Sequence, residues 1–158
     1  MDKLEELKKQ RVELDKRIEA LEYAEQIFEE GEKMWFIDHF GNVQRSSWGG
    51  QEWISLAFVQ GNIFKTGKAA ELEANRRNLL TRFRAFRDEC NGDWKADWSN
   101  LDKKWEINYK EKEFKTLWSY ELNSFPTFGH FKNEQDIKRA IELFGDEIKK
   151  LFIDCECD

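Results

Sequence analysis

Hydrophobic residues recur every seven positions through the first thirty residues of the chain. Two series share this spacing, and their members are Leu7, Leu14, Leu21 and Phe28 in one, and Leu4 and Ile18 in the other. The two-stripe pattern is typical of a coiled coil, and it predicts one long helix over residues 2–30 that Gly31 ends. Arg11 and Glu25 interrupt the second series, and such interruptions can fix the register or the partner of a coiled coil.

We therefore expect residues 1–31 to be a coiled-coil helix that joins copies of the chain into a homo-oligomer. The predicted contact residues are the six hydrophobic side chains of the two series: Leu4, Leu7, Leu14, Ile18, Leu21 and Phe28. The alternative is an amphipathic helix that packs against its own domain.

Two aromatic-rich segments of equal length begin and end with Trp. They read WFIDHFGNVQRSSW at residues 35–48 and WEINYKEKEFKTLW at residues 105–118. Side chains alternate in both segments, which predicts two β-hairpins. Gly41-Asn42 suits a two-residue turn in the first. Glu111-Lys112 stands in its place in the second, where we expect a wider connection.

Each hairpin precedes an amphipathic helix with a similar beginning, Phe-Lys-Thr at 64–66 and Phe-Lys-Asn at 131–133. Thr66 and Asn133 are the predicted N-caps, and Asn91-Gly92 is the predicted end of the first helix. Residues 52–62 fit either a further strand or a short helix.

The predicted fold class is α+β. Residues 34–158 are expected to form one domain of two ββα units, 34–92 and 93–152, ending in a short acidic tail with Cys155 and Cys157. The two units would form a pseudo-twofold antiparallel sheet with both helices on one face.

Composition excludes several classes of protein. No apolar run approaches the roughly 18 residues of a membrane span, and the beginning of the chain does not read as a signal peptide. The odd number of three Cys fits a reducing cytoplasm. The phosphate-binding, nucleophile and zinc-protease motifs of common enzymes are missing, so we expect no catalytic residues, no cofactor and no metal.

Positive charge concentrates on the first predicted amphipathic helix, although the whole chain carries a net charge of −6. Residues 62–88 hold two Lys and five Arg against two Glu and one Asp. Paired guanidinium donors match phosphate geometry and stack on aromatic rings. The predicted ligand-binding residues are therefore Arg76, Arg77, Arg84 and Arg87 together with Trp35 and Trp105. The alternative is a solvated helix flank that pairs with carboxylates of the N-terminal segment.

Several of these stretches resemble a class of small phage and prophage proteins from Gram-positive bacteria. The stretches are WFIDHFG, GNIFKT, GDWKADW and FKNEQDIKRAIELFGDEIKKL, and the resemblance covers most of residues 34–152. Ala96 and Gly67 depart from it, since Pro and an acidic residue are usual at these places. The resemblance implies a phage-borne accessory protein, and such proteins often antagonise host antiviral defence.

The resulting hypothesis is a non-enzymatic binding protein in the host bacterial cytoplasm that sequesters an anionic nucleotide-type ligand. One alternative is an inhibitor that binds a host defence protein, such as a CRISPR nuclease, directly. Another is a structural or nucleic-acid-associated phage protein.

Overall fold

The computed structural model describes residues 2–155, which divide into two compact units between Ala74 and Asn75. This part of the chain forms four α-helices, a short π-helix and five strands, so the predicted α+β class is confirmed. The strands form two separate antiparallel sheets, which corrects the expected single shared sheet. β1 pairs with β2 and β3, and β4 pairs with β5 and through one bridge with Phe131, so each hairpin finds its partners within its own unit.

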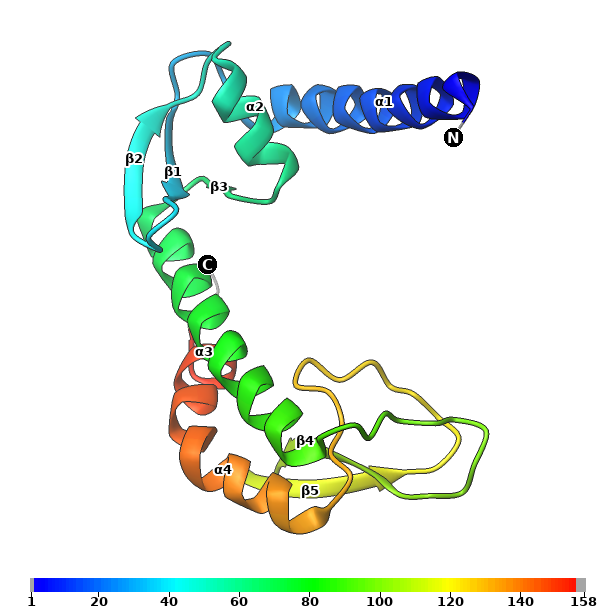
Figure 1. Ribbon diagram of the computed structural model, residues 1–158. Helices are drawn as coiled ribbons and strands as arrows, with labels where there is room; N and C mark the ends of the chain where they lie inside the picture. Colours follow the sequence, from blue (N-terminus) through cyan, green and yellow to red (C-terminus); the bar gives the residue numbers. More distant parts are fainter. Residues whose placement is uncertain (1, 156–158) are drawn as a thin grey trace. The chain divides into compact units, whose positions relative to one another are not determined.

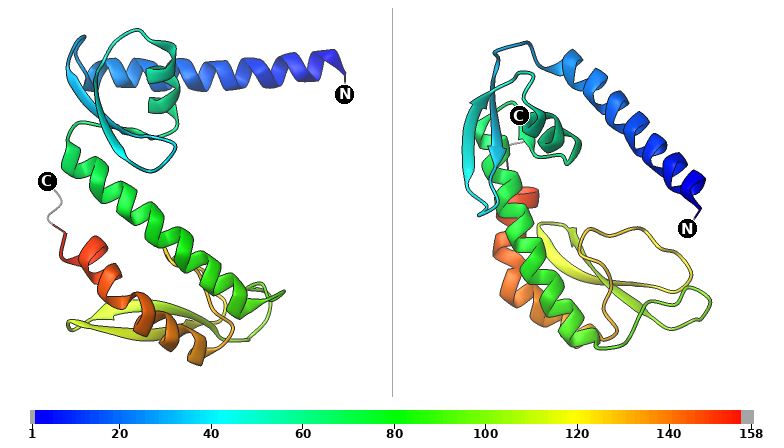
Figure 2. Two further views of the ribbon diagram at one scale, coloured as in Figure 1. Left: turned by 60° about the vertical axis from the view of Figure 1, so that its left-hand side comes forward. Right: turned by 45° about the horizontal axis from the view of Figure 1, so that its top comes forward.

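Helix α1 covers Lys3–Ile27. Asp2 caps it, because its side chain accepts a hydrogen bond from the Leu4 N–H at 3.3 Å. The helix ends slightly earlier than predicted, because Phe28 adopts extended backbone and its ring stacks on Trp48 with centroids 5.0 Å apart. In Figures 1 and 2 the rest of α1 extends away from the other elements of the first unit.

The first unit contains a three-stranded sheet in the order β2-β1-β3. Its elements are β1 (Lys33–Ile37), β2 (Val43–Ser47), helix α2 (Glu52–Val59) and β3 (Ile63–Phe64). Its core joins the end of α1 to β1 and α2 through Ala24, Phe28, Met34, Trp48 and Ile54. The ambiguous segment is a helix because Ile54 and Phe58, four residues apart, both reach this core.

Helix α3 covers Gly67–Asn91. The Ala69 N–H donates to Thr66 Oγ1 at 3.1 Å, which confirms the predicted cap. The predicted end is also confirmed, since Gly92 follows the helix with a φ of +54°. Gly67 allows close packing, because a Cβ there would lie 3.0 Å from the Trp35 indole nitrogen.

The second unit pairs β4 (Lys104–Lys110) with β5 (Glu113–Ser119), followed by helix α4 (Glu134–Ile148) and the π-helix η1 (Lys149–Ile153). Asn133 is the N-cap of α4, as predicted, although its side chain makes no capping bond. Aromatic rings fill the core, where Phe83 of α3 contacts Phe128, Phe131 and Phe144. Phe131 also bridges to Trp105 of β4 through two backbone hydrogen bonds of 2.7 and 3.0 Å.

The two hairpin turns are the reverse of the prediction. Residues 38–42 form a five-residue loop, in which the Asp38 carboxylate accepts the N–H groups of Phe40 and Asn42 at 2.9 Å. Glu111 and Lys112 instead make a two-residue turn, with φ values of 57° and 65°. The left-handed backbone that Gly and Asn adopt readily is therefore adopted here by two charged residues.

The terminal tryptophans of the hairpins occupy different positions in the two sheets. Trp105 faces Trp118 across β4 and β5, whereas Trp35 faces Arg45 and Trp48 lies beyond the end of β2. The first unit also inserts α2 and β3 between its hairpin and α3. Both halves of the sequence therefore contain a hairpin and a later long helix, but they differ in the elements between these two and in strand register.

Gly145 offers a test of packing in the second unit. It is buried inside α4, and a Cβ there would lie 3.5 Å from side-chain atoms of Ile141 and Phe114, which is ordinary contact. We expect Gly145→Ala to raise the free energy of unfolding by about 0.5–1 kcal/mol, because Ala loses less backbone entropy in a helix. Chemical denaturation measures this. Gly129→Ala is the control that should destabilise, since Gly129 has a φ of +73° and faces the Arg87 guanidinium.

Candidate functional site

The hydrophobic seam of α1 is exposed along most of the helix. We define the seam as the residues of the two heptad series that lie outside the core: Leu4, Leu7, Leu14, Ile18 and Leu21. Leu14 is 56% exposed, the first four members are all exposed, and Leu21 is half-buried. Phe28 is 4% exposed and belongs to the core of its own unit, which corrects its assignment to an oligomer contact.

The C-terminal part of α1, from Arg17 onward, is the part that packs in its unit. Ala24 is fully buried there, and Arg17 lies 3.8 Å from Glu52 at the start of α2. A helix in water is marginal when no hydrophobic face is buried. Covering the exposed half of one Leu side chain contributes about 1 kcal/mol, so the seam has several kcal/mol to gain from a partner.

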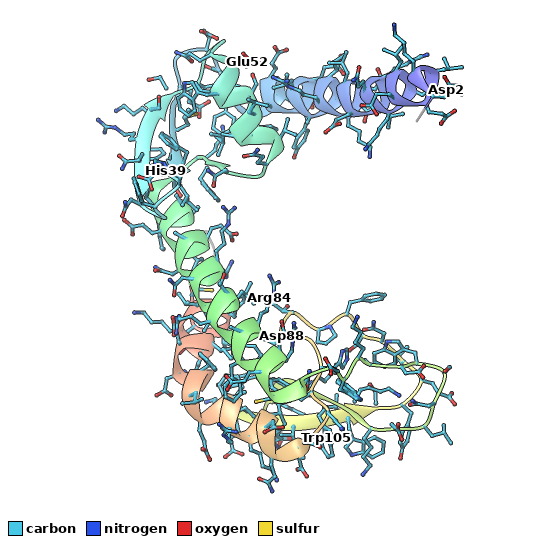
Figure 3. The ribbon with its side chains drawn as sticks, in the orientation of Figure 1. Asp2, His39, Glu52, Arg84, Asp88 and Trp105 are labelled. Carbon is cyan, nitrogen blue, oxygen red and sulfur yellow. The ribbon has the colours of Figure 1, made fainter. Side chains whose placement is uncertain are left out.

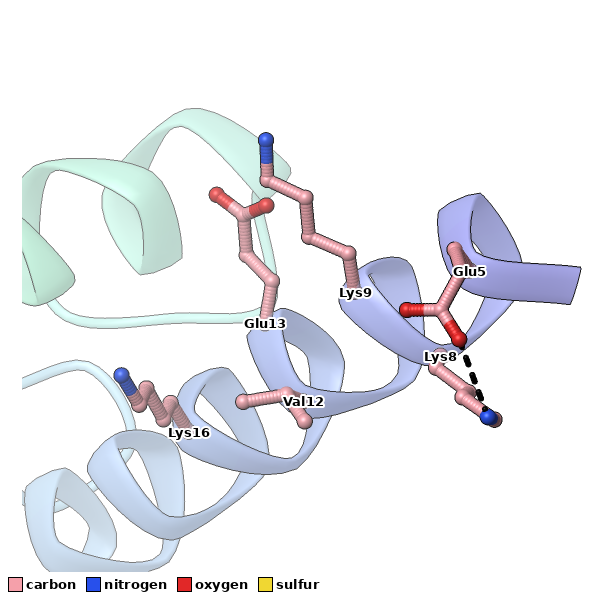
Figure 4. A pocket seen from close by; sticks show the side chains of 6 residues that line it. All are labelled: Glu5, Lys8, Lys9, Val12, Glu13 and Lys16. Carbon is pink, nitrogen blue, oxygen red and sulfur yellow. Dashed lines mark hydrogen bonds and ion pairs between the residues drawn. The ribbon is translucent and has the colours of Figure 1, made fainter. Parts of the chain in front are cut away.

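The side of α1 opposite the seam is different in chemistry. A shallow hollow there is lined by Glu5, Lys8, Lys9, Val12, Glu13 and Lys16, all from this one helix (Figure 4). Lys8 lies at the edge of the hollow, next to the seam, because it directly follows Leu7 at the second core position of the heptad. Lys8 Nζ lies 3.1 Å from Glu5 Oε1 across one turn. Charged side chains on one side and aliphatic side chains on the other are typical of a helix that pairs along a single face.

Arg76 is engaged with its own unit. Its Nε donates to the Leu151 carbonyl at 2.8 Å, its Nη2 donates to Cys155 Sγ at 3.2 Å, and its guanidinium lies over the Phe152 ring. The last carbonyls of a helix have no partner inside it, and they carry partial negative charge. Arg76 therefore caps the end of η1.

Of the other predicted arginines, Arg87 is also engaged within its own unit. Arg87 donates to Asp88 Oδ1 at 2.7 and 2.9 Å and to the Phe128 carbonyl at 3.3 Å. Arg77 is exposed. Arg84, labelled in Figure 3, is exposed and makes no polar contact within the described residues 2–155. The guanidiniums of Arg76 and Arg87 thus stabilise the unit that carries them.

The two predicted ring partners are also built into sheets. Trp35 is half-buried on β1 against Gly67. Trp105 is half-buried on β4 between Trp118 and Phe131, and Lys103 Nζ lies 5.5 Å from its ring centroid (Figure 3).

A buried polar cluster in the second unit was not predicted from the sequence. Lys104 and Glu106 project from one face of β4, and both are buried. The Ser124 hydroxyl donates to the two Glu106 carboxylate oxygens at 2.9 and 3.2 Å. Lys104 Nζ donates to the Asn100 carbonyl and side-chain oxygens at 3.1 and 2.8 Å. Polar and hydrophobic residues alternate along β4, so the sequence predicted that the face with Lys104 and Glu106 would be in contact with solvent. No sequence motif near β4 indicates that the segment around Ser124 covers this face.

His130 completes the cluster. Its Nε2 lies 3.3 Å from Glu106 Oε2 without hydrogen-bond geometry, and this nitrogen atom makes no hydrogen bond in the described part of the chain. Burial lowers the pKa of His130 below its ordinary value of 6.5, while the Glu106 carboxylate opposes the shift. Both side chains are about nine-tenths buried. The pair therefore holds the segment before α4 against β4 and does not present an acid or base at the surface.

A second apolar surface lies at the end of β5 and in the segment after it. Leu117, Trp118, Tyr120, Leu122 and Phe125 are all exposed there. Phe125 is 87% exposed and has a φ of +53°, an uncommon backbone for a bulky residue.

Comparison with known proteins identifies no relative of this chain. No protein-family model, curated protein or solved structure matches this chain. Among residues 2–155, no three His, Cys, Asp or Glu side chains gather in a way that would hold a metal ion. The helices in the same range are also too short or too polar to cross a bilayer.

We expect Arg76→Ala to lower the free energy of unfolding by about 1–3 kcal/mol, because it removes a helix cap and a ring contact together. Arg84→Ala, on the same helix, should change it by less than about 0.5 kcal/mol. Thermal unfolding followed by circular dichroism compares the two variants. Equal losses would show that Arg76 does not cap η1.

His130 should make stability depend on pH. Its pKa is lowered in the folded chain, so its contribution is fully present above pH 6.5 and is lost as pH falls toward the folded pKa. The charged groups that act on it are Glu106, Arg87 and Lys104. Urea unfolding at pH 7.5 and pH 5.5 should show a larger loss for the native chain than for His130→Gln. The same loss in both would mean that His130 is not the group responsible.

Proposed function

We propose that this chain is a non-enzymatic binding protein that assembles with a second copy of itself through α1. The observation that carries the proposal is the seam, an exposed row of aliphatic residues at heptad spacing on a helix that projects from its unit (Figures 1 and 3). In such a dimer α1 is the assembly element, and the two α+β units remain available for other partners.

Two observations favour self-association through the seam over a monomer whose seam remains exposed to solvent. The seam is aliphatic while the opposite side of α1 is charged, so one face alone gains from contact. The core of the first unit already contains Phe28 and Ala24, which lie beyond the seam. Leu4, Leu7 and Leu14 are too far along the helix to join that core, because each turn adds about 5.4 Å.

The wider hypotheses remain predictions. Capture of an anionic ligand by the arginine helix is weakened by the use of Arg76 and Arg87 within their own unit. Antagonism of host defence rests on the resemblance to phage proteins alone. The exposed aromatic segment ending at Phe125 fits a protein target better than a small anion.

Leu14→Glu tests the assembly, with Val12→Glu as its matched control. Leu14 is 56% exposed and Val12 is 54% exposed, but Val12 lies on the charged side of α1. The substitution removes two Leu14 side chains from each dimer interface, one per copy, so Leu14→Glu should raise the dimer dissociation constant by at least about 30-fold.

Sedimentation equilibrium measures both variants and the native chain. Val12→Glu should dimerise like the native chain. A native chain that stays monomeric at high micromolar concentration would overturn the proposal, as would equal weakening by both substitutions.

A further inference from the structure

We propose that the two copies of α1 run antiparallel, so that Leu7 of one copy lies beside Ile18 of the other. This inference rests on the proposed self-association and names its geometry. In heptad notation the first core position, a, is held by Leu4, Arg11 and Ile18, and the second, d, by Leu7, Leu14 and Leu21.

Arg11 argues against the parallel arrangement. Equivalent core positions face each other in a parallel pair, so Arg11 would meet Arg11 of the second copy inside the seam. Like charges in one partly desolvated layer cost more than surface pairs can recover, since a surface pair contributes about 0–1 kcal/mol. In an antiparallel pair position a faces position d, so Arg11 meets Leu14. The Arg11 side chain is 84% exposed, so its guanidinium can extend to solvent.

The exposed length of the seam selects the register. Pairing Leu4 with Leu21 and Leu7 with Ile18 also aligns Arg11 with Leu14, and each pair occurs twice. This register uses all five seam residues and leaves Phe28 in its own core. The next register along the helix would place Leu4 against Phe28, which is already buried and therefore inaccessible.

Charges beside the seam favour the same orientation. An antiparallel pair places Lys8 beside Asp15 of the second copy on both sides of its axis. Both side chains are about 60% exposed, and their ion-pair partners, Glu5 for Lys8 and Arg11 for Asp15, lie on the same helix. A parallel pair instead places Lys3 beside Lys8. The parallel pair also places Arg17 beside Glu22 of the second copy, which is favourable. Glu52 of the same chain already lies 3.8 Å from Arg17 and competes for it.

Cysteine cross-linking tests the orientation in the full chain with Cys90, Cys155 and Cys157 replaced by Ser. A mixture of Leu7→Cys and Ile18→Cys chains should form a disulfide between positions 7 and 18, identified by mass spectrometry of the linked peptides. Neither variant should link to itself, because equal positions would lie about 16 Å apart along the axis, beyond disulfide reach. Ready linkage of Ile18→Cys to itself would overturn the antiparallel arrangement.

A charge substitution gives opposite signs for the two orientations. Lys8→Glu should weaken an antiparallel dimer about tenfold, because two attractive pairs become repulsive. Adding Asp15→Lys to it should restore the affinity. In a parallel dimer Lys8→Glu would strengthen association, because the new carboxylate would face Lys3. Lys9→Glu is the control, since Lys9 leaves α1 on another side (Figure 4), and it should leave the affinity unchanged.

The two proposals fail in different ways. A native chain that is monomeric overturns self-association and the orientation together. A native dimer that links position 18 to position 18, and that Lys8→Glu strengthens, leaves self-association standing and overturns the antiparallel arrangement alone.

Discussion

The stacking of Phe28 on Trp48 determines how the first unit is organised. Phe28 belongs by spacing to the heptad series, yet its ring lies in the core formed with Met34 and Ile54. For its ring to reach that core, the backbone must leave the helix at this residue, so the contact sets the end of α1. It also separates the heptad series into one member that is buried and five that lie along the projecting helix. The seam exists because the core it adjoins is small and already filled.

Local chemistry made several elements predictable from the sequence. The Thr66 hydroxyl marks the beginning of α3 and Gly92 marks its end. Both could be predicted because a helix cap depends on only a few neighbouring residues. Alternation located the strands of both hairpins for the same reason. The connections were less predictable. Asp38 accepts several N–H groups in its loop and so makes it wide, while cross-strand pairing holds Glu111 and Lys112 in left-handed backbone.

Long-range contacts explain what the sequence did not reveal. Charge counting marked Arg76 and Arg87 as ligand residues, but backbone carbonyls distant in the sequence, at Leu151 and Phe128, accept their hydrogen bonds. A positive helix flank looks the same in a sequence whether its guanidiniums meet a ligand or a helix end. The Lys104 and Glu106 face was hidden for a similar reason, since the segment that covers it comes about twenty residues later.

The bond between Arg76 and the Leu151 carbonyl joins residues 75 positions apart. During synthesis the arginine leaves the ribosome long before its acceptor, so α3 must first exist without this contact to η1. Contacts of such large separation form late, because a long loop must close before they are gained. The second unit therefore completes its fold only when the π-helix has emerged, and until then its aromatic core is exposed to other chains.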